Sequence, residues 1–173
     1  MSAPLNTIRT LDPDIAIVAL GANLDSRVGV PAQTFASVCS ELAALAAGEL
    51  RCSSFHQTVP EDCPPDSPPF LNAVVLFRVA GAPSAEQLLD QLQALENSFG
   101  RARSGVVNAP RSLDLDLIAY GNREQAGADL TLPHPRATQR LFVVEPLAEL
   151  APQLKLPGCI VSVQVLVDNL RKP

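Results

Sequence analysis

The stretch Phe70-Leu-Asn-Ala-Val-Val-Leu-Phe-Arg-Val79 decides the predicted fold, because its side chains alternate as a strand of a sheet requires. Every second residue from Leu71 to Val79 is apolar, and successive side chains of a strand point to opposite faces. One face of this strand therefore belongs to a hydrophobic core. The opposite face begins with Phe70 and Asn72, which places an aromatic ring and an amide on the other side of the sheet.

The segments on either side of this strand predict further strands and amphipathic helices. Pro31 marks one helix start, because proline suits the first helical turn, and we expect that helix to end at Gly48. Ser84 and Gln87 form a capping-box pattern that marks a second start. The expected strands cover residues 15–20, 51–58, 70–79 and 113–120, and the expected helices cover residues 31–48, 84–99, 142–150 and 163–170.

The order of these elements predicts an α+β fold, a ferredoxin-like βαββαβ sandwich. Its sheet is mostly antiparallel, with helices on one face and extra C-terminal helices, and the other face is expected to be open for a ligand. The 173 residues, 47% of them hydrophobic, suffice for one domain with its own core. We expect a polar lead-in at residues 1–13, whose order the sequence leaves open, and a single domain at residues 14–173. This plan hosts many activities, so it does not identify the function.

Composition and charge exclude several classes of protein. Thirteen basic residues against 18 acidic ones give a net charge of −5, which argues against phosphate-backbone binding to nucleic acid. No apolar run approaches the ~18 residues of a membrane span, and no secretory signal is visible. The four cysteines are scattered without CxxC spacing, so reduced thiols are the simplest interpretation. We expect a cytoplasmic monomer without nucleic-acid or membrane partners.

The segment Leu-Asp-Leu-Asp-Leu at residues 113–117 carries the strongest chemical signal. In a strand, Asp114 and Asp116 share one face, while the three leucines share the core face. Two adjacent carboxylates repel each other, and a hard cation such as Mg²⁺, which often bridges carboxylates to substrate phosphates, would offset that repulsion. A solvated strand face neutralised by arginines is the alternative explanation, and for this pattern alone it is the more common one.

Three arginines precede the acid pair, namely Arg101, Arg103 and Arg111. Guanidinium groups suit phosphate oxygens, and carboxylates that hold cations beside arginines that hold anions are the components of phosphoryl transfer. Internal Arg–Asp salt bridges explain the same residues equally well. Glycine-rich phosphate loops are excluded, because Val106 and Val107 stand where a Walker A motif needs Lys and Ser or Thr, and no GxGxxG occurs.

A series of segments in the chain resembles the 6-hydroxymethyl-7,8-dihydropterin pyrophosphokinase family. The likeness runs in family order from about residue 15 to residue 155, and the series is highly specific. The matching segments include Ala-Leu-Gly-Ala-Asn-Leu at 19–24, Phe-Leu-Asn-Ala-Val at 70–74, Gly-Arg-Ala-Arg at 100–103, Ala-Pro-Arg-Ser-Leu-Asp-Leu-Asp-Leu at 109–117 and Leu-Thr-Leu-Pro-His-Pro-Arg at 130–136.

The resemblance implies a reaction and a set of roles. The reaction is a Mg²⁺-dependent transfer of pyrophosphate from ATP to the pterin hydroxymethyl oxygen, in folate biosynthesis, with AMP released. Two Mg²⁺ ions are expected, and the loops at 58–69 and 100–110 are expected to close as lids. The implied catalytic residues are Arg101, Arg103, Asp114 and Asp116, the last two as metal ligands; the implied pterin-binding residues are Thr58, Phe70, Asn72 and Phe142; the implied nucleotide-binding residues are Glu96, Arg111, Thr131, His134 and Arg140.

Without the resemblance, several of these residues have ordinary explanations. Phe70 and Phe142 would more often be core aromatics, and His134 between two prolines is as often a turn residue as a ligand. The chain also departs from the family pattern, with Asn108 in place of a frequent Trp and Val-Pro-Glu-Asp at 59–62 in place of Pro-Pro-x-Gly. A non-catalytic ligand-binding or oligomerising module is the alternative function, and an RNA-binding module is a weaker one.

Overall fold

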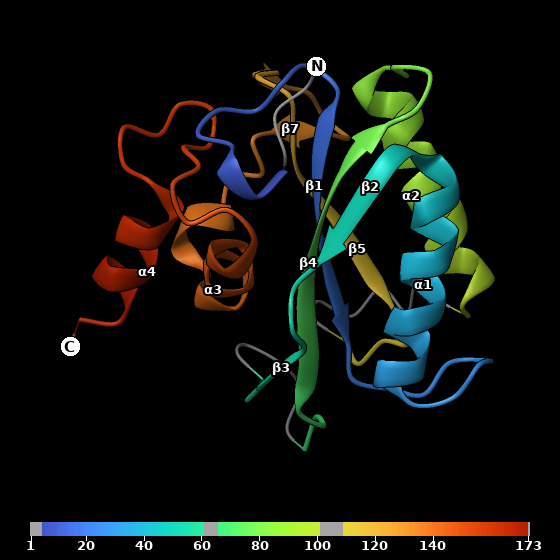
Figure 1. The fold of residues 1–173 in the computed structure, drawn as a ribbon. Coiled ribbons are helices and arrows are strands. Elements are labelled where there is room, and N and C mark those ends of the chain that lie inside the picture. The colour runs from blue at the N-terminus through green and yellow to red at the C-terminus, as the bar shows by residue number, and fades with distance from the viewer. Residues whose placement is uncertain (1–4, 61–65, 101–108, 173) are drawn as a thin grey trace.

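The computed structural model describes residues 5–60, 66–100 and 109–172. Its main sheet has the strand order β2-β4-β1-β5, and every neighbouring pair is antiparallel. Strand β3 also pairs with β4, at the start of β4, whereas β2 pairs with the later part of that strand. This order and the helices between the strands confirm the ferredoxin-like α+β prediction (Figure 1). The strands are β1 Ile15–Ala22, β2 Ala46–Cys52, β3 His56–Thr58, β4 Phe70–Val79 and β5 Asp114–Tyr120.

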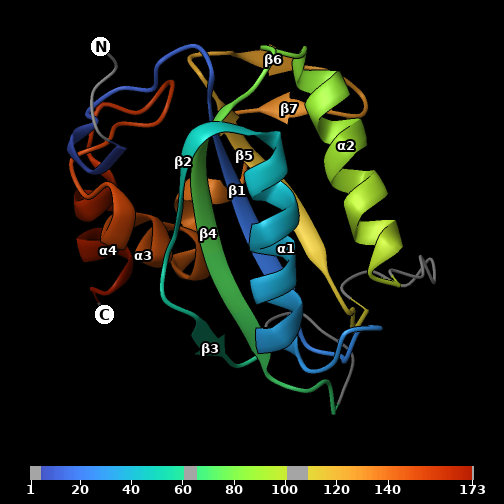
Figure 2. The same cartoon turned by 45° about the vertical axis from the view of Figure 1, so that its right-hand side comes forward.

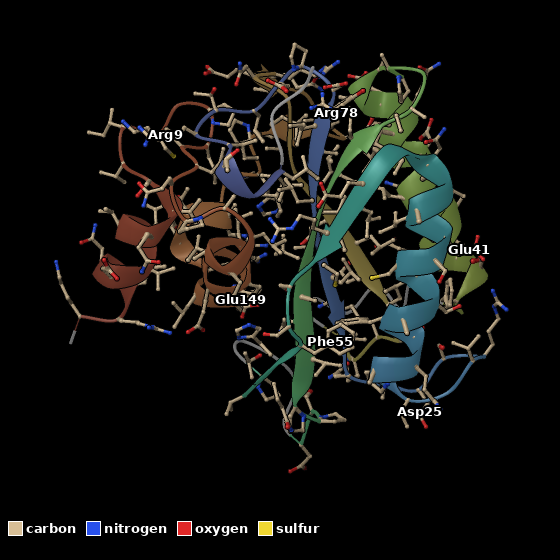
Figure 3. All side chains as sticks on the ribbon, viewed as in Figure 1. Arg9, Asp25, Glu41, Phe55, Arg78 and Glu149 are labelled. Atoms are coloured by element: carbon tan, nitrogen blue, oxygen red, sulfur yellow. The ribbon has the colours of Figure 1, made fainter. Side chains whose placement is uncertain are left out.

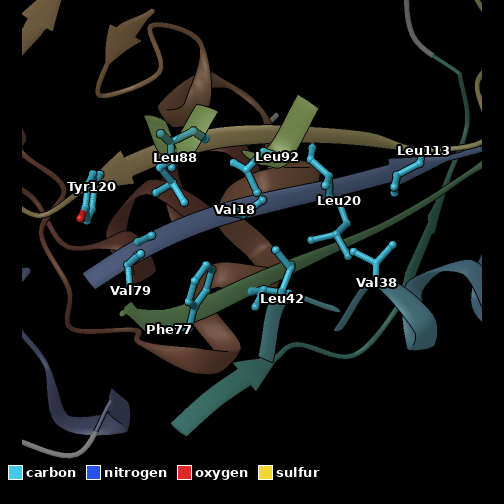
Figure 4. Close-up of a cluster of buried hydrophobic side chains, with 14 of the residues drawn as sticks. Val18, Leu20, Val38, Leu42, Phe77, Val79, Leu88, Leu92, Leu113 and Tyr120 are labelled. Carbon is cyan, nitrogen blue, oxygen red and sulfur yellow. The ribbon is translucent and has the colours of Figure 1, made fainter. Parts of the chain in front are cut away.

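Two helices, α1 (Pro31–Leu45) and α2 (Ala85–Ser98), cover one face of this sheet (Figure 2). Their leucines meet the core-facing side chains of β1, β4 and β5, and the fully buried Phe77 and Tyr120 belong to this cluster (Figure 4). The alternation read from the sequence of β4 is confirmed, because its odd-numbered residues face this core. At the start of α2, the Ser84 hydroxyl accepts the amide of Gln87, as the capping-box pattern predicts.

The opposite face of the sheet is not open along its whole length, which corrects the expectation. Two C-terminal helices, α3 (Leu141–Leu150) and α4 (Val163–Leu170), lie on this side (Figure 1). They enclose a second hydrophobic cluster with Val74 and Leu76 of β4 and Ile15 and Ile17 of β1. Here β1 and β4 carry apolar side chains on both faces of the sheet, and both faces must therefore be covered. Within the described part of the chain, the end of the sheet that carries Asn72 and the acid pair has polar side chains on this face instead.

Residues 5–13 pack more firmly than a polar lead-in would. They include the short helix η1 (Leu5–Thr7), and the side chains of Leu5, Ile8 and Leu11 are buried in the second cluster. The carboxylates of Asp12 and Asp14 both pair with Arg78 at the end of β4. Apolar residues at a spacing of three are a weak pattern in so short a segment, which is why the sequence did not reveal this packing.

Two expected boundaries were wrong. The strand predicted at 51–58 is two strands, β2 and β3, separated by Ser53–Phe55, because the Ser53 hydroxyl instead accepts the amide of Val74 and breaks the regular ladder. The helix predicted to reach Gly48 ends at Leu45, and β2 begins directly after it. The remaining short elements are β6 Gln125–Ala126, β7 Thr131–Leu132 and η2 Ala137–Gln139.

Two further sequence expectations concern thiols and membranes. Cys39, Cys52 and Cys159 are free thiols, and Cys63 lies outside the described residues. Over the ranges that the structure describes, we find no helix with the length and apolar character needed to cross a membrane.

Candidate active site

Three neighbouring strands bring Asn72, Gly21 and Asp114 into one row across the sheet. Gly21 of β1 pairs with Asn72 of β4 on one side and with Asp114 of β5 on the other. A Cβ atom on Gly21 would lie 3.7 Å from Oδ1 of Asn72 and 3.8 Å from Cβ of Asp114. The glycine therefore leaves the space between the amide and the carboxylate open. Sequence reasoning missed Gly21 as part of the site, although it stands in the matched segment at 19–24.

The next row of the sheet places Ala19 beside Asp116. Both aspartates point to the outer face of β5, while Leu115 and Leu117 belong to the core on the other side. The Asp114 and Asp116 side chains keep 19% and 39% of their exposure, so the carboxylates can be reached from solvent. This agrees with the facing predicted from their spacing in the strand.

Each aspartate faces an arginine. Nη1 of Arg111 donates to Oδ2 of Asp114 at 2.6 Å, and Nη1 of Arg140 lies 3.9 Å from Oδ2 of Asp116. Burial and the nearby charge of Asp114 raise the pKa of Asp116 above its ordinary value, against the opposing influence of His134 and the arginines. Burial and the neighbouring Asp114 thus disfavour the ionised form of Asp116 even though arginines lie nearby.

The same two arginines lie over aromatic rings. The guanidinium carbon of Arg111 is 5.6 Å from the ring centroid of Phe70, and that of Arg140 is 5.4 Å from the ring centroid of Phe142. Both distances suit cation–π contacts. Nε of Arg111 is buried and has no hydrogen-bond partner within the described part of the chain. Two acid–arginine–aromatic sets thus border the exposed end of the sheet.

Asn72 and Thr58 form a polar pair beside these sets. Nδ2 of Asn72 donates to Oγ1 of Thr58 at 2.8 Å, and β3 holds Thr58 in register with Phe70. The Asn72 side chain is only 6% exposed, so its orientation is fixed by packing as well as by this bond. The bond uses a donor of the amide and leaves Oδ1 on the side of Gly21.

A pocket of about 340 Å³ opens between α2, β5 and the β6–β7 hairpin, next to the acid pair. Glu96 lines it but is 2% exposed, and its Oε1 accepts the amide of Leu115 at 2.6 Å, which anchors α2 to β5. Gln93, one turn before Glu96, also lines the pocket and was not identified from the sequence. The other polar residues around the pocket are Asp114, Asp116, Asp129, Thr131 and His134.

An irregularity in the pairing of β5 with β1 helps to position His134. The register between β1 and β5 shifts at Ile17/Val18, so that Ile118 and Ala119 both face the second cluster. The carbonyl of Ile118 accepts the amide of His134 at 2.8 Å, and bulges of this kind commonly re-aim groups near a site. Burial, reinforced by Arg140 and Arg136, lowers the pKa of His134, although Asp116 opposes this. The imidazole is therefore neutral at pH 7.

Two predicted catalytic residues, Arg101 and Arg103, lie outside the described residues, as does Asn108. The structure brings the remaining predicted residues together around the acid pair. They lie on β3, β4, β5, α2, β7 and α3 and on the segments before β5 and before α3. Phe70 and Phe142 are only half buried and contact arginines, so they are not purely core aromatics.

In sequence, the chain is similar to proteins of one named family. Residues 17–152 match the family model described as 7,8-dihydro-6-hydroxymethylpterin-pyrophosphokinase (HPPK). A Synechocystis protein named 2-amino-4-hydroxy-6-hydroxymethyldihydropteridine pyrophosphokinase is 41% identical over 156 residues, which are 90% of this chain and 75% of that protein. A Haemophilus influenzae protein of the same name is 36% identical over 83% of this chain and 85% of its own length.

Solved structures show the same fold at greater distance. A crystal structure of Plasmodium falciparum HPPK-DHPS superposes with a TM-score of 0.67 over 96% of this chain and 47% of that chain. The sequence identity there is 12%, so the likeness concerns the fold alone.

Proposed function

The chain belongs to the 7,8-dihydro-6-hydroxymethylpterin-pyrophosphokinase family, and from that premise we propose how its residues divide the work of the reaction. The enzyme transfers pyrophosphate from ATP to the hydroxymethyl group of 6-hydroxymethyl-7,8-dihydropterin, which gives AMP and the pterin diphosphate in folate biosynthesis. The site must therefore hold a triphosphate and a flat heterocycle so that the hydroxymethyl oxygen meets the β-phosphorus.

Asp114 and Asp116 are the residues that would hold Mg²⁺, and two ions are expected. Their donor set fits, because Mg²⁺ takes carboxylate oxygens from one or two residues and completes its shell with substrate phosphates and water. The raised pKa of Asp116 supports the same assignment, since it reflects burial of the carboxylate and, after that, the neighbouring negative charge of Asp114. Bound Mg²⁺ would neutralise phosphate charge and so ease attack at the phosphorus.

Arginines supply the remaining positive charge. Arg111 and Arg140 stand beside the acid pair and over aromatic rings, where their unshared donors can take phosphate oxygens. Arg101 and Arg103 are assigned to the same task from the segment between α2 and β5, in agreement with the motif they occupy. Together these side chains would hold the triphosphate in line with the incoming hydroxyl.

The pterin and the nucleoside are assigned to separate sides of the acid pair. Asn72 and Thr58 offer an amide oxygen and a hydroxyl to the polar edge of the pterin, and Phe70 and Phe142 offer ring faces for stacking. The nucleoside is assigned to the pocket beside α2, where Glu96, Thr131 and His134 lie. A neutral His134 can both donate and accept a hydrogen bond there.

The row of Asn72, Gly21 and Asp114 is the observation that carries this division, because it sets a pterin-type amide and a metal-type carboxylate on either side of an open position. The test is to mix the protein with ATP, Mg²⁺ and the reduced hydroxymethylpterin and to identify the nucleotide product. We expect AMP, and no product once EDTA removes the metal. ADP would indicate an ordinary kinase, and no nucleotide product with Mg²⁺ present would favour a non-catalytic ligand-binding module.

We further expect a cytoplasmic monomer that binds its two small-molecule substrates without nucleic acid or a membrane. The net charge of −5 supports the expectation about nucleic acid. Light scattering after size-exclusion chromatography would test the monomer, since a dimer would double the mass of 18.3 kDa.

A further inference from the structure

Glu149 of α3 binds the segment that leads into β3 with both of its carboxylate oxygens. Oε2 accepts the amide of Ser54 at 2.8 Å, and Oε1 accepts the Ser54 hydroxyl at 2.7 Å and Nε2 of His56 at 2.5 Å. The hydrogen bonds from Ser54 and His56 outweigh the effect of burial and lower the pKa of Glu149, so the carboxylate is ionised at pH 7. Three charge-assisted hydrogen bonds therefore join two elements that lie 93 or more residues apart in the chain.

The element held in this way is short and has little else to fix it. Strand β3 contains three residues, and among the described strands it pairs only with β4. A second carboxylate of α3, that of Glu145, lies 3.9 Å from Nδ1 of His56. Figure 3 shows Glu149 on the α3 side of the sheet, close to the level of the labelled Phe55, which directly precedes His56. The placement of β3 therefore depends on α3 as well as on the sheet.

Both joined elements carry residues assigned to the pterin. Thr58 is the last residue of β3, and its hydroxyl accepts a hydrogen bond from Nδ2 of Asn72, so a shift of β3 would also remove this bond from the Asn72 amide. Phe142 is near the beginning of α3, about two turns before Glu149. The carboxylate of Glu149 thus links the two walls between which the pterin would lie.

The hydrogen bonds argue against a separate hydrolytic role for the serine and histidine. Ser54 Oγ and Glu149 Oε1 both lie at Nε2 of His56, at 3.2 Å and 2.5 Å. In a nucleophilic triad the acid binds the nitrogen opposite the one that takes the serine proton. Here the same nitrogen is used for both contacts, and the Ser54 hydroxyl donates to Glu149.

We propose that Glu149 is a positioning residue for the pterin substrate, which acts by holding Ser54 and His56 so that Thr58 and Asn72 keep the orientation the pterin edge requires. This inference rests on the proposed function, and it deepens that function by adding a residue that does not itself touch the substrate. It predicts an effect on the pterin and little effect on ATP, because the hydrogen bonds of Glu149 go to Ser54 and His56, which do not line the nucleotide pocket in the described part of the chain.

The test compares Glu149→Ala, Glu149→Gln and Ser54→Ala with the wild type and with the control Glu41→Ala. Glu41 is an exposed residue of α1 on the other face of the sheet (Figure 3). For each protein, the KM for the reduced pterin, the KM for ATP and kcat are measured at a temperature at which circular dichroism shows the variant to be folded. Pterin affinity is also measured by calorimetry with a nonhydrolysable ATP analogue present, so that the result does not depend on turnover.

We expect Glu149→Ala to raise the KM and Kd for the pterin about tenfold and to leave the KM for ATP within twofold, since one misplaced polar contact is worth roughly a factor of ten. Glu149→Gln keeps one acceptor oxygen, and Ser54→Ala keeps the hydrogen bond from the backbone amide of residue 54 to Glu149. Each variant should therefore weaken pterin binding by only about threefold. Glu41→Ala should match the wild type.

A merely structural role would lower the melting temperature but leave both affinities of the folded enzyme unchanged, and that result would overturn the proposal. An equal loss for ATP and pterin would overturn it as well. If Glu149→Ala does not fold, the two milder variants decide by the same criteria. Failure of the wild type to form AMP would count against the proposed function instead, and the calorimetric comparison of variants would still decide the role of Glu149.

Discussion

The two ends of the central strands differ on the face that α3 covers. At one end this face carries Ile15, Ile17 and Leu76, all fully buried against the C-terminal helices. At the other end the same face carries Asn72, Asp114 and Asp116 beside the small residues at positions 19 and 21. The core face of the same strands remains apolar along its length. The sheet therefore uses one face for stability throughout and divides the other between packing and chemistry.

The two ends also differ in how their charges are balanced. At the packed end, Arg78 forms direct ion pairs with both Asp12 and Asp14. At the polar end, Asp116 is 3.9 Å from its arginine and its pKa is raised by burial and by Asp114. Unbalanced charge is tolerated where a ligand is to be bound, and variants at each end should separate activity from stability.

The largest effect should follow removal of one charge at the polar end. Asp114→Asn or Asp116→Asn should lower AMP formation about a thousandfold, because loss of one group that stabilises developing charge typically has that magnitude. The fold should survive, since neither residue contributes to a hydrophobic cluster. Asp90→Asn, on an exposed position of α2, is the control. Full activity in both variants would exclude the metal assignment.

At the packed end, the most destabilising substitution is expected at Gly121. This residue has φ +56°, and a Cβ there would lie 2.6 Å from the carbonyl oxygen of Pro13 and 2.8 Å from its Cα. Gly121→Ala should lower the free energy of unfolding in urea by about 3 kcal/mol, through backbone strain and this clash.

The matched control for that variant is Gly81→Ala. Gly81 also has positive φ, at +72°, but apart from its chain neighbours no atom of the described residues lies within 4 Å of the added Cβ. It should cost only the roughly 1 kcal/mol of left-handed backbone strain. Equal losses in the two variants would show that contact with Pro13 does not matter.

Asn72→Ala should separate the pterin-binding residues of the site from the nucleotide-binding ones. Loss of the amide should lower kcat/KM for the pterin about 30-fold, because a site that hydrogen-bonds its substrate discriminates strongly when one partner is missing. The KM for ATP should change little. Asn169→Ala, at an exposed position of α4, provides the control. A loss confined to the KM for ATP would contradict the assignment of Asn72 to the pterin.

A smaller effect is expected from Arg78→Met, which keeps the aliphatic stem and removes two ion pairs. Because Asp12 and Asp14 are partly exposed, the free energy of unfolding should fall by only about 1 kcal/mol. Activity should equal that of the wild type, in contrast to the aspartate variants. Arg9→Met, at an exposed residue, serves for comparison, and impaired catalysis by folded Arg78→Met would contradict the separation of the two ends.

The smallest effect concerns the stability of Asp116→Asn without nucleotide or divalent ions. The pKa of Asp116 is raised in the folded protein, first by burial and then by Asp114, so the ionised carboxylate disfavours the fold at neutral pH. The variant should be more stable than the wild type at pH 7. The difference in stability should shrink as the pH falls. It should vanish below about 3.9, the pKa of an unfolded Asp, where Asp116 is protonated in both the folded and the unfolded state. Lower stability of the variant at pH 7 would refute this.

Local patterns predicted much of the fold. The alternation in residues 70–79 gave the correct facing of β4, and Pro31 and the Ser84–Gln87 pair gave the starts of α1 and α2. The spacing of Asp114 and Asp116 gave their common face. These features depend on interactions within a few residues, which is why sequence reasoning succeeded. The break between β2 and β3 was missed because it depends on a bond from Val74, 21 residues after Ser53.

The roles assigned to the site residues, including those of Arg101 and Arg103, stay predictions. The sequence predicted neither Gly21 as the open position nor the pocket beside Gln93, since both arise from residues on different elements. It also predicted an open outer face, whereas α3 and the residues near Leu5 cover one end of it. Which apolar segment covers which face is decided by packing between distant parts of the chain.

By itself, the sequence determined the alternation of each strand, the helix starts and the acid pair on one face, because these follow from the 2.0 and 3.6 periods of the backbone and from local hydrogen bonds. Only the tertiary structure decided which face positions of neighbouring strands meet, how the bulge at Ile118 places His134, and how Glu149 holds β3. Register and helix docking depend on free energies summed over contacts between distant residues, and a linear pattern does not contain those contacts.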